Sequence, residues 1–248
     1  MFFYSREAKD RGILNSLPME LYEKATQELS SILGDKPIII TEGKTDWKHL
    51  KQALRRFQDE YYYLDLDIEF LQYEDNIQMG DAQLDSMVES FKKTNQPRKT
   101  IFMFDRDNDK YTRKYGNEEF YNYKNNVYIF CIPKINDELD NICLEFYYEE
   151  NNLKTEDESG RRLFLGKDFF TNGNSKCGEY QAKEQNKCSK LSIIDDRVFK
   201  KDDLEHTSSV VLSKNDFSEN ILEEKENFNN FNIENFKKIF DLIEKIIK

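Results

Sequence analysis

The chain has 248 residues and a formal net charge of −11, with 38% hydrophobic, 14% aromatic and 34% charged residues. This length and apolar share suffice for one large α/β domain or for a core domain with an appended lobe. No run of eighteen apolar residues is present, so no membrane-spanning helix is expected, and the acidic charge argues against nucleic-acid binding by overall electrostatics alone.

Two further features favour a cytoplasmic protein. The N-terminus has only three aromatic residues before charges begin, too few for the core of a signal peptide. Cys131 and Cys143 lie in apolar stretches typical of a buried core. Cys177 and Cys188 stand in a polar stretch at a spacing unlike the close cysteine pairs of structural zinc sites, so we expect no zinc.

The predicted elements alternate in type along the first half of the chain. In order they are a helix at 18–33, a buried strand at 36–41, an amphipathic helix at 46–57, a strand at 66–73, a helix at 81–93, and strands at 99–104 and 125–133. Asp46 is expected to cap the helix at 46–57. Hydrophobic strands joined by charged crossovers favour an α/β fold with a mostly parallel sheet covered on both faces.

The second half divides into three predicted parts. Residues 136–148 are acid-rich and read as helical. Residues 149–190 are polar and glycine-containing, which indicates an inserted lobe with a short strand or hairpin at 159–170. Residues 191–248 are expected to supply a last core strand and helix within 208–221 and an amphipathic C-terminal helix at 235–248. We therefore expect a core at 1–148, a lobe at 149–190 and a closing segment at 191–248.

Carboxylates follow two of the predicted strands. Glu42 and Asp46 follow the strand at 36–41, and Asp105, Asp107 and Asp109 follow the strand at 99–104. If these strands are neighbours, the acidic groups converge where ligands bind in open parallel sheets. Such a cluster repels itself unless cations fill it, and hard oxygen ligands suit Mg²⁺ or Mn²⁺. These ions support attack on phosphodiesters.

The same residues are open to other interpretations. Asp46 alone reads as a helix cap, and an isolated Asp-x-Asp after a strand is often only a turn. A calcium loop of the EF-hand type fails, because Lys110 and Gly116 occupy the positions that require glycine and glutamate. A phosphatase of the haloacid dehalogenase type expects threonine or valine where Asp109 stands, although a phosphotransfer enzyme remains an alternative.

The stretches "ITEGKTD" and "FMFDRDND" together resemble the Toprim domain of topoisomerases, bacterial primases and several nucleases. The resemblance covers about residues 36–135 and implies a Rossmann-like sheet. It also implies that Glu42 acts as a general acid or base or as a metal ligand, and that Asp105 and Asp107 hold Mg²⁺. Asp46 and Asp109 would assist.

Within that family, the chain is similar to the OLD-like and PARIS effector nucleases of bacterial defence. These carry a further acidic residue and a late lysine, which by position match Glu145 and Lys214. The lysine would neutralise charge that develops on phosphate. From the residues alone, without the resemblance, Glu145 is interpreted as an ordinary carboxylate on a helix surface and Lys214 as a solvated lysine. The chain contains no G-x-x-x-x-G-K-[ST] motif, so any ATPase would be a partner protein.

Basic residues lie next to the acidic motifs. Arg106, Arg113 and Lys114 follow the first aspartate, and Lys48 lies in the helix after Glu42; they are candidate contacts to a nucleic-acid backbone, or else a solvated face. We expect a Mg²⁺- or Mn²⁺-dependent nuclease that acts on DNA or RNA. The partners expected are nucleic acid, an ATPase and a second copy of the chain. The alternatives are a non-catalytic, partner-activated module and a small-molecule phosphotransfer enzyme.

The homodimer expectation rests on apolar residues near the two ends of the chain. Phe2, Phe3 and Tyr4 are the aromatic residues concerned, together with the C-terminal helix.

Overall fold

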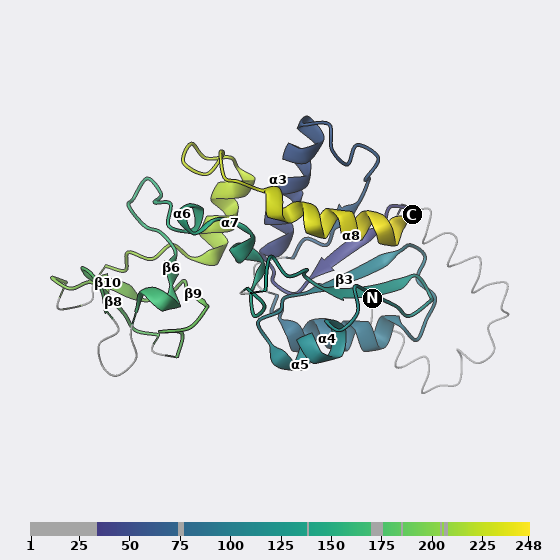
Figure 1. Ribbon diagram of the computed structural model, residues 1–248, viewed down its shortest axis with the longest axis horizontal. Helices are drawn as coiled ribbons and strands as arrows, with labels where there is room; N and C mark the ends of the chain where they lie inside the picture. The colour runs from purple at the N-terminus through teal and green to yellow at the C-terminus, as the bar shows by residue number, and fades with distance from the viewer. Residues whose placement is uncertain are drawn as a thin grey trace.

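A mostly parallel five-stranded sheet forms the centre of the computed structural model (Figure 1). The structure describes residues 34–73, 77–137, 139–169, 176–184, 186–203, 205 and 208–248, so the predicted helix at 18–33 and the N-terminal aromatic residues lie outside it. The strands, in spatial order, are β2 (Glu69–Phe70), β1 (Ile38–Thr41), β3 (Thr100–Phe104), β5 (Val127–Cys131) and β4 (Tyr121–Asn122). All neighbours are parallel except β4, which runs antiparallel to β5.

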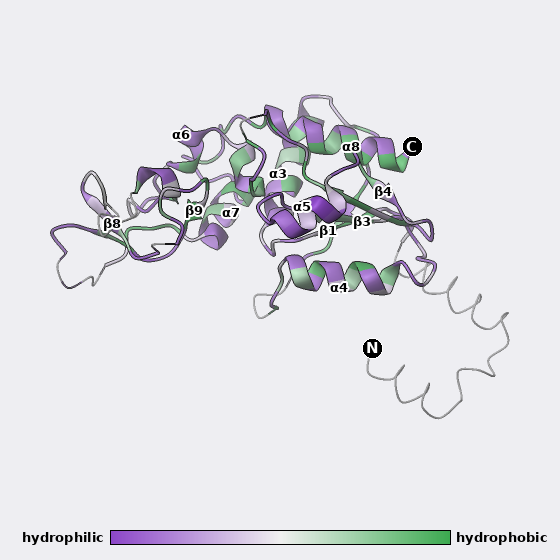
Figure 2. Ribbon diagram, turned by 60° about the horizontal axis from the view of Figure 1, so that its bottom comes forward, coloured by the Kyte–Doolittle hydropathy of each residue, from purple (hydrophilic) through white to green (hydrophobic). Residues whose placement is uncertain are grey.

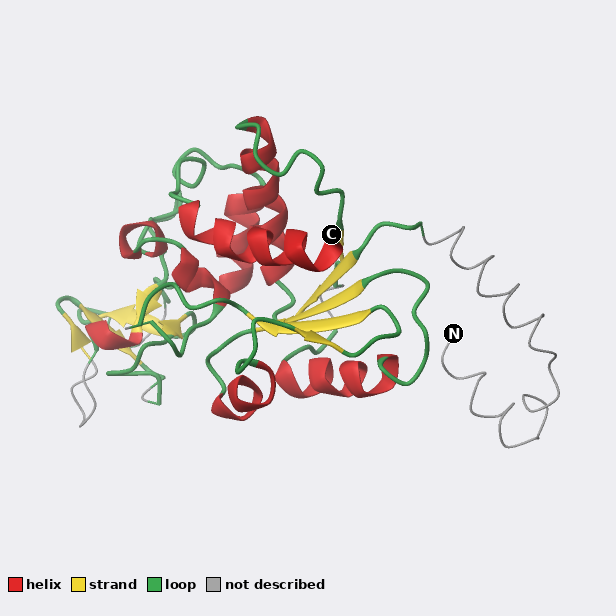
Figure 3. Cartoon of the chain, turned by 45° about the vertical axis from the view of Figure 1, so that its right-hand side comes forward, coloured by secondary structure: helices red, strands yellow, loops and turns green. Residues whose placement is uncertain are grey.

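Helices cover both faces of this sheet, as the sequence predicts. Helices α3 (Asp46–Asp59) and α8 (Lys237–Ile247) lie on one face, and α4 (Asp81–Phe91) and α5 (Asp109–Tyr115) on the other (Figures 1 and 3). Side chains of β3 alternate between the two layers: Met103 joins the core under α3 and α8, and Phe104 the core over α4 and α5. Hydrophobic and hydrophilic residues alternate along α4 and α8, matching their half-buried positions (Figure 2).

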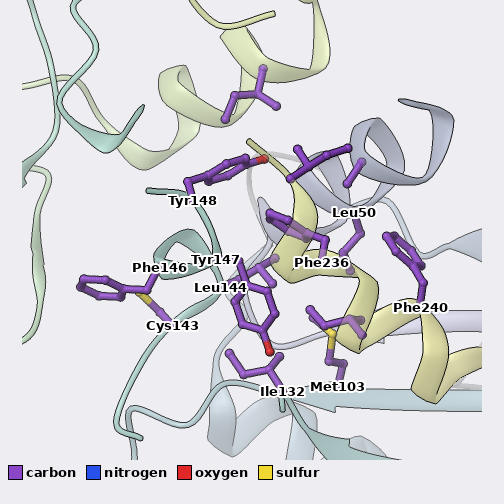
Figure 4. Packing of buried hydrophobic residues seen from close by; sticks show 14 of the residues in the cluster. Leu50, Met103, Ile132, Cys143, Leu144, Phe146, Tyr147, Tyr148, Phe236 and Phe240 are labelled. Atoms are coloured by element: carbon purple, nitrogen blue, oxygen red, sulfur yellow. The ribbon is translucent and has the colours of Figure 1, made fainter. Parts of the chain in front are cut away.

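The core under α8 includes the short 3₁₀ helix η2 (Leu144–Tyr147), one side of which packs on the sheet. In Figure 4, Leu144 and Tyr147 point toward Ile132 and Met103, whereas Phe146 extends away from them. The apolar side of α8 is also packed within this core, through buried residues such as Phe240. The helix expected to help form a homodimer therefore uses its apolar face inside its own chain.

Two predicted elements are shorter than expected. The strand at 66–73 reduces to β2, which among the described strands pairs with β1 alone. The helix predicted for 136–148 is wrong for most of its length, because of the described residues 136–137 and 139–148 only those of η2 are helical. The backbone of the preceding loop is instead bonded to Arg106, which donates from Nε to the Asp140 carbonyl and from its amide to the Ile142 carbonyl.

The last core strand predicted within 208–221 is also not present in the central sheet. Val211 forms one isolated bridge with Arg162, and the helix that follows is α7 (Lys214–Leu222). The amides of Arg162 and Leu212 bond to the carbonyls of Val210 and Arg162. Residues 210–212 are thereby paired with the polar segment rather than with either edge of the sheet.

The polar segment, together with residues 191–200, forms a lobe beside the carboxyl ends of the strands, which converge toward it in Figure 3. Its elements are α6 (Glu150–Leu153), β6 (Phe164–Leu165), the 3₁₀ helix η3 (Gly166–Asp168), β7 (Lys176–Cys177), β8 (Tyr180–Ala182), β9 (Ile193–Ile194) and β10 (Val198–Lys200). Strand β6 pairs with β9, so 159–170 contains a strand but does not close as a hairpin on itself. Leu165 and Ile193 of the lobe are buried in the main core, so the lobe packs against that core.

The described cysteines Cys131 and Cys143 are buried and free, as expected, and so is Cys188. No helix in the described part of the chain combines the length and apolar character required to cross a membrane.

Candidate metal centre

The two acidic motifs meet because β1 and β3 are neighbours in register. Thr41 pairs with Met103, so the residues after each strand lie side by side. The Glu42 amide donates to the Met103 carbonyl over 3.1 Å, and the Glu42 carboxylate accepts a 3.1 Å bond from the Asp105 amide. The convergence predicted from the strand ends is therefore present.

Glu42, Asp105 and Asp107 form an acidic cluster suited to a cation. One carboxylate oxygen of each residue lies within 4.8 Å of those of the other two. Asp107 is exposed, Glu42 half-buried, and Asp105 only 8% exposed. The Oδ1 atom of Asp105 is buried without a hydrogen-bond partner. Because an unpaired buried acceptor is costly, this oxygen indicates a site for a proton or a metal ion.

Asp46 does not cap its helix, which corrects the capping prediction. The N-cap of α3 is Thr45, and no side chain bonds to the free amides there. Asp46 instead accepts a 2.7 Å bond from the Gly43 amide, while the Thr41 hydroxyl donates to the Gly43 carbonyl over 2.8 Å. Asp46 is thus buried behind Glu42, where it shapes the turn and adds negative charge.

Gly43 is required by this turn because no side chain fits. A Cβ atom at this position would lie 2.7 Å from the Asp46 Cγ. Gly43→Ala is therefore expected to lower the free energy of unfolding by about 1–3 kcal/mol and to weaken Mn²⁺ binding, measured by urea unfolding and titration calorimetry. The matched control is Gly80→Ala, where the new methyl meets only the Gln83 Oε1 at 3.5 Å. Equal effects of the two variants would contradict this role of the turn.

A buried ion pair lies next to the cluster. Lys214, the first residue of α7, contacts the Glu145 carboxylate at 3.0 Å, and their side chains are 31% and 1% exposed. The sequence alone left Glu145 open as a helix-surface residue, but η2 buries it. Its Oε1 has no hydrogen-bond partner. Lys48 fixes α7 through Asn215 at 3.2 Å and through an ion pair with Glu219.

Burial and mutual repulsion shift the acid–base equilibria of the cluster. Burial, then the Asp107 charge, raises the pKa of Glu42 to about 8. Burial, then the Glu145 charge, raises the pKa of Asp46 to about 7, against the opposing effect of Lys214. Burial and the neighbouring carboxylates likewise hold the pKa of Asp105 well above its ordinary value. These groups therefore retain protons near neutral pH unless a cation replaces them.

The stability of the metal-free protein is expected to fall as the pH rises. The folded-state pKa of Glu42, about 8, exceeds the ordinary 4.5, so the folded protein binds this proton more tightly than the unfolded chain does. Ionisation above pH 4.5 consequently opposes folding. We expect the melting temperature in EDTA to decrease between about pH 5 and pH 8, and Mg²⁺ to remove most of that decrease. A melting temperature in EDTA that rises over this pH range would contradict the raised pKa values of these carboxyl groups.

The four residues predicted to contact nucleic acid differ in exposure and in the partners of their side chains. Arg106 is 7% exposed and pairs with Asp140 at 3.0 Å, and Lys48 is buried in its contacts with α7. Lys114 pairs with Asp85 at 2.6 Å and with Glu89. The structure therefore places these three side chains in intramolecular ion pairs.

Arg113, the fourth predicted contact, and the predicted metal ligand Asp109 are both exposed. Arg113 is 82% exposed and lies 3.7 Å from the Asp109 carboxylate. Asp109 begins α5 and lies outside the three-carboxylate cluster. The structure thus does not bring Asp109 to the metal centre.

Two residues near the centre were missed by the sequence reasoning. Asp81 begins α4, accepts a hydrogen bond from Asn108, and raises the pKa of both Glu42 and Asp107 by repulsion. The sequence does contain a signal for Asp81, because this carboxylate follows the predicted strand at 66–73 and so lies at the same edge of the sheet as the two acidic motifs. The Asn141 amide lies 3.0 Å from the Asp107 carbonyl and donates to it when its nitrogen faces that way. No local sequence signal marks Asn141.

Comparison with protein-family models, curated proteins and solved structures found no match for the chain.

Proposed function

We propose that the protein is a Mg²⁺- or Mn²⁺-dependent nuclease of the Toprim type that cleaves phosphodiester bonds in DNA or RNA. The proposal rests chiefly on the Asp105 Oδ1, a buried carboxylate oxygen without a partner inside a three-carboxylate cluster. Such an arrangement is stabilised by a bound cation. The position of the cluster at the carboxyl ends of parallel strands supports the same function.

The donor set fits a hard divalent cation, since it consists of carboxylate oxygens with exposure on the Asp107 side. Glu42, Asp105 and Asp107 would hold the ion, which stabilises the charge on the entering and leaving oxygens of a phosphodiester. Glu42 is half-buried, so it can serve either as a ligand or as a general acid or base. Lys214 lines the same cavity as Asp107, where its ammonium can neutralise charge on phosphate.

Partner activation is the second candidate function. Lys48, Arg106 and Lys114 are engaged in ion pairs, and the net charge is −11. These observations favour a partner, such as an ATPase of a defence complex, that brings nucleic acid to the centre. An antiphage role and a cytoplasmic location belong to the same proposal.

The test is cleavage of labelled plasmid DNA, single-stranded DNA and transfer RNA with Mg²⁺ or Mn²⁺, with EDTA as the control. Metal-dependent cleavage of any of these supports the nuclease. Metal binding by calorimetry without cleavage supports the partner-activated module. Hydrolysis of a chromogenic phosphate ester, with every polynucleotide left intact, would replace both with a small-molecule phosphotransfer enzyme.

A further inference from the structure

A cavity of about 570 Å³ lies between the metal centre and the lobe. Asp107 and Lys214 line it on the side of the metal centre. Phe146, which belongs to the main core and is 8% exposed, forms part of its apolar lining. On the lobe side it is lined by Lys190 and Leu191. The cavity thus connects Asp107 of the acidic cluster to lobe residues far from it in the sequence.

The lobe residues at this cavity are held in a fixed loop, which we call the 187–192 loop. The loop wraps around Gly166: the Ser189 amide donates to the Gly166 carbonyl over 2.7 Å, and the Gly166 amide donates to the Ser192 carbonyl over 2.8 Å. A Cβ atom at Gly166 would lie 2.6 Å from the Lys190 carbonyl. The adjoining Ile193 pairs with Leu165 in the main core. These hydrogen bonds therefore fix the shape of the cavity wall, and packing against the main core fixes its position.

Lys190 has no oppositely charged partner among the residues that the structure describes. Lys187, in the same loop, pairs with Asp195 at 2.7 Å, and Lys214 pairs with Glu145. Among the described residues, the exposed Lys190 side chain makes no ion pair or hydrogen bond. An unpaired ammonium beside a cavity that also contains Asp107 is available to a ligand that bears negative charge.

We propose that the 187–192 loop clamps a single strand of nucleic acid, with Lys190 on a phosphate beside the cleaved one and a base or sugar against Phe146 and Leu191. The clamp rests on the proposed nuclease function. Proteins that bind single strands combine a cationic groove with apolar or aromatic surfaces for the bases, which is the combination present here. A flexible strand can bend into a concave site of this volume, whereas the rigid outer surface of a duplex cannot.

The experiment measures binding of a fluorescein-labelled single-stranded oligonucleotide and its duplex by fluorescence anisotropy, with Ca²⁺ in place of Mg²⁺ to limit cleavage. Lys190→Gln is compared with Lys183→Gln, an exposed lysine of the same lobe that does not line the cavity. We expect Lys190→Gln to raise Kd for the single strand about three- to tenfold and to reduce the slope of log Kd against log salt by about 0.7. Lys183→Gln should leave both values unchanged, and wild type should bind the single strand more tightly than the duplex.

The outcomes separate the clamp from the nuclease. If wild type cleaves but Lys190→Gln and Lys183→Gln bind alike, the clamp is overturned and the nuclease stands. If binding depends on Lys190 while no substrate is cleaved, the clamp stands and the nuclease fails. Equal binding of single strand and duplex would overturn the choice of a single strand.

Discussion

Asp105→Asn is expected to abolish metal-dependent cleavage while making the metal-free protein more stable. The carboxylate that would hold the ion is 8% exposed and lies near Glu42, Asp46 and Asp107, so without a cation it must take up a proton for the protein to fold at neutral pH, which costs free energy. Loss of a ligand removes several kcal/mol of charge stabilisation, or about a thousandfold in rate. Asparagine keeps the shape of the side chain but removes the repulsion.

The experiment is a paired measurement of cleavage rate and melting temperature in EDTA and in Mg²⁺. Asp109→Asn is the matched control, because Asp109 is exposed and lies outside the cluster. We expect the control to cleave at the wild-type rate and to keep the rise in melting temperature caused by Mg²⁺. If Asp105→Asn lowers the melting temperature in EDTA, or if Asp109→Asn is equally inactive, the placement of the metal centre is incorrect.

Lys214→Met is expected to destabilise the protein at neutral pH and to abolish cleavage. Burial alone would raise the pKa of Glu145, but the adjacent Lys214 ammonium holds it at about 2. The pair therefore stabilises the fold above the ordinary carboxyl pKa of 4.5. Removing the lysine leaves a buried, unpaired carboxylate, which lowers the free energy of unfolding by about 2–4 kcal/mol. This loss is smaller than for a fully buried pair because Lys214 is 31% exposed.

A double-mutant cycle with Glu145→Gln separates the two effects. The double variant removes both charges, so it should regain most of the free energy of unfolding lost in Lys214→Met. It should nevertheless remain inactive, because the ammonium that faces the cavity is missing. A double variant as unstable as the sum of the single ones would show that the pair is not coupled. Recovery of activity together with stability would assign Lys214 a purely structural role.

The sheet and the acidic cluster were predictable because their signals are local. The runs Ile38–Thr41 and Thr100–Phe104 have the continuous apolar pattern typical of a covered parallel strand, and the carboxylates directly follow them. The role of Asp46 was misjudged because the capping rule considers the helix alone, whereas here the Gly43 amide competes for the carboxylate.

The remaining features depend on contacts between distant parts of the chain. The pairing of Arg106 with Asp140, and of Lys48 with α7, spans sequence separations that no motif records. The pairing of β6 with β9 likewise places the 187–192 loop across from Asp107. The position of Lys214 is a weak sequence signal of a functional role, because a lysine in the first turn of a helix is unfavourable next to the positive end of the helix dipole. Local rules are most often broken at functional sites.

The packing of Leu165 and Ile193 into the main core has a consequence for how the molecule opens. The lobe has a small core of its own, which includes Phe164 and Ile194, but the neighbouring residues of β6 and β9 pack in the core shared with α8 and the central sheet. The amides of these strands should therefore exchange with solvent only in the same rare global opening that exposes β3. The cationic loop and the acidic centre would then persist or be lost together, as one cooperative unit.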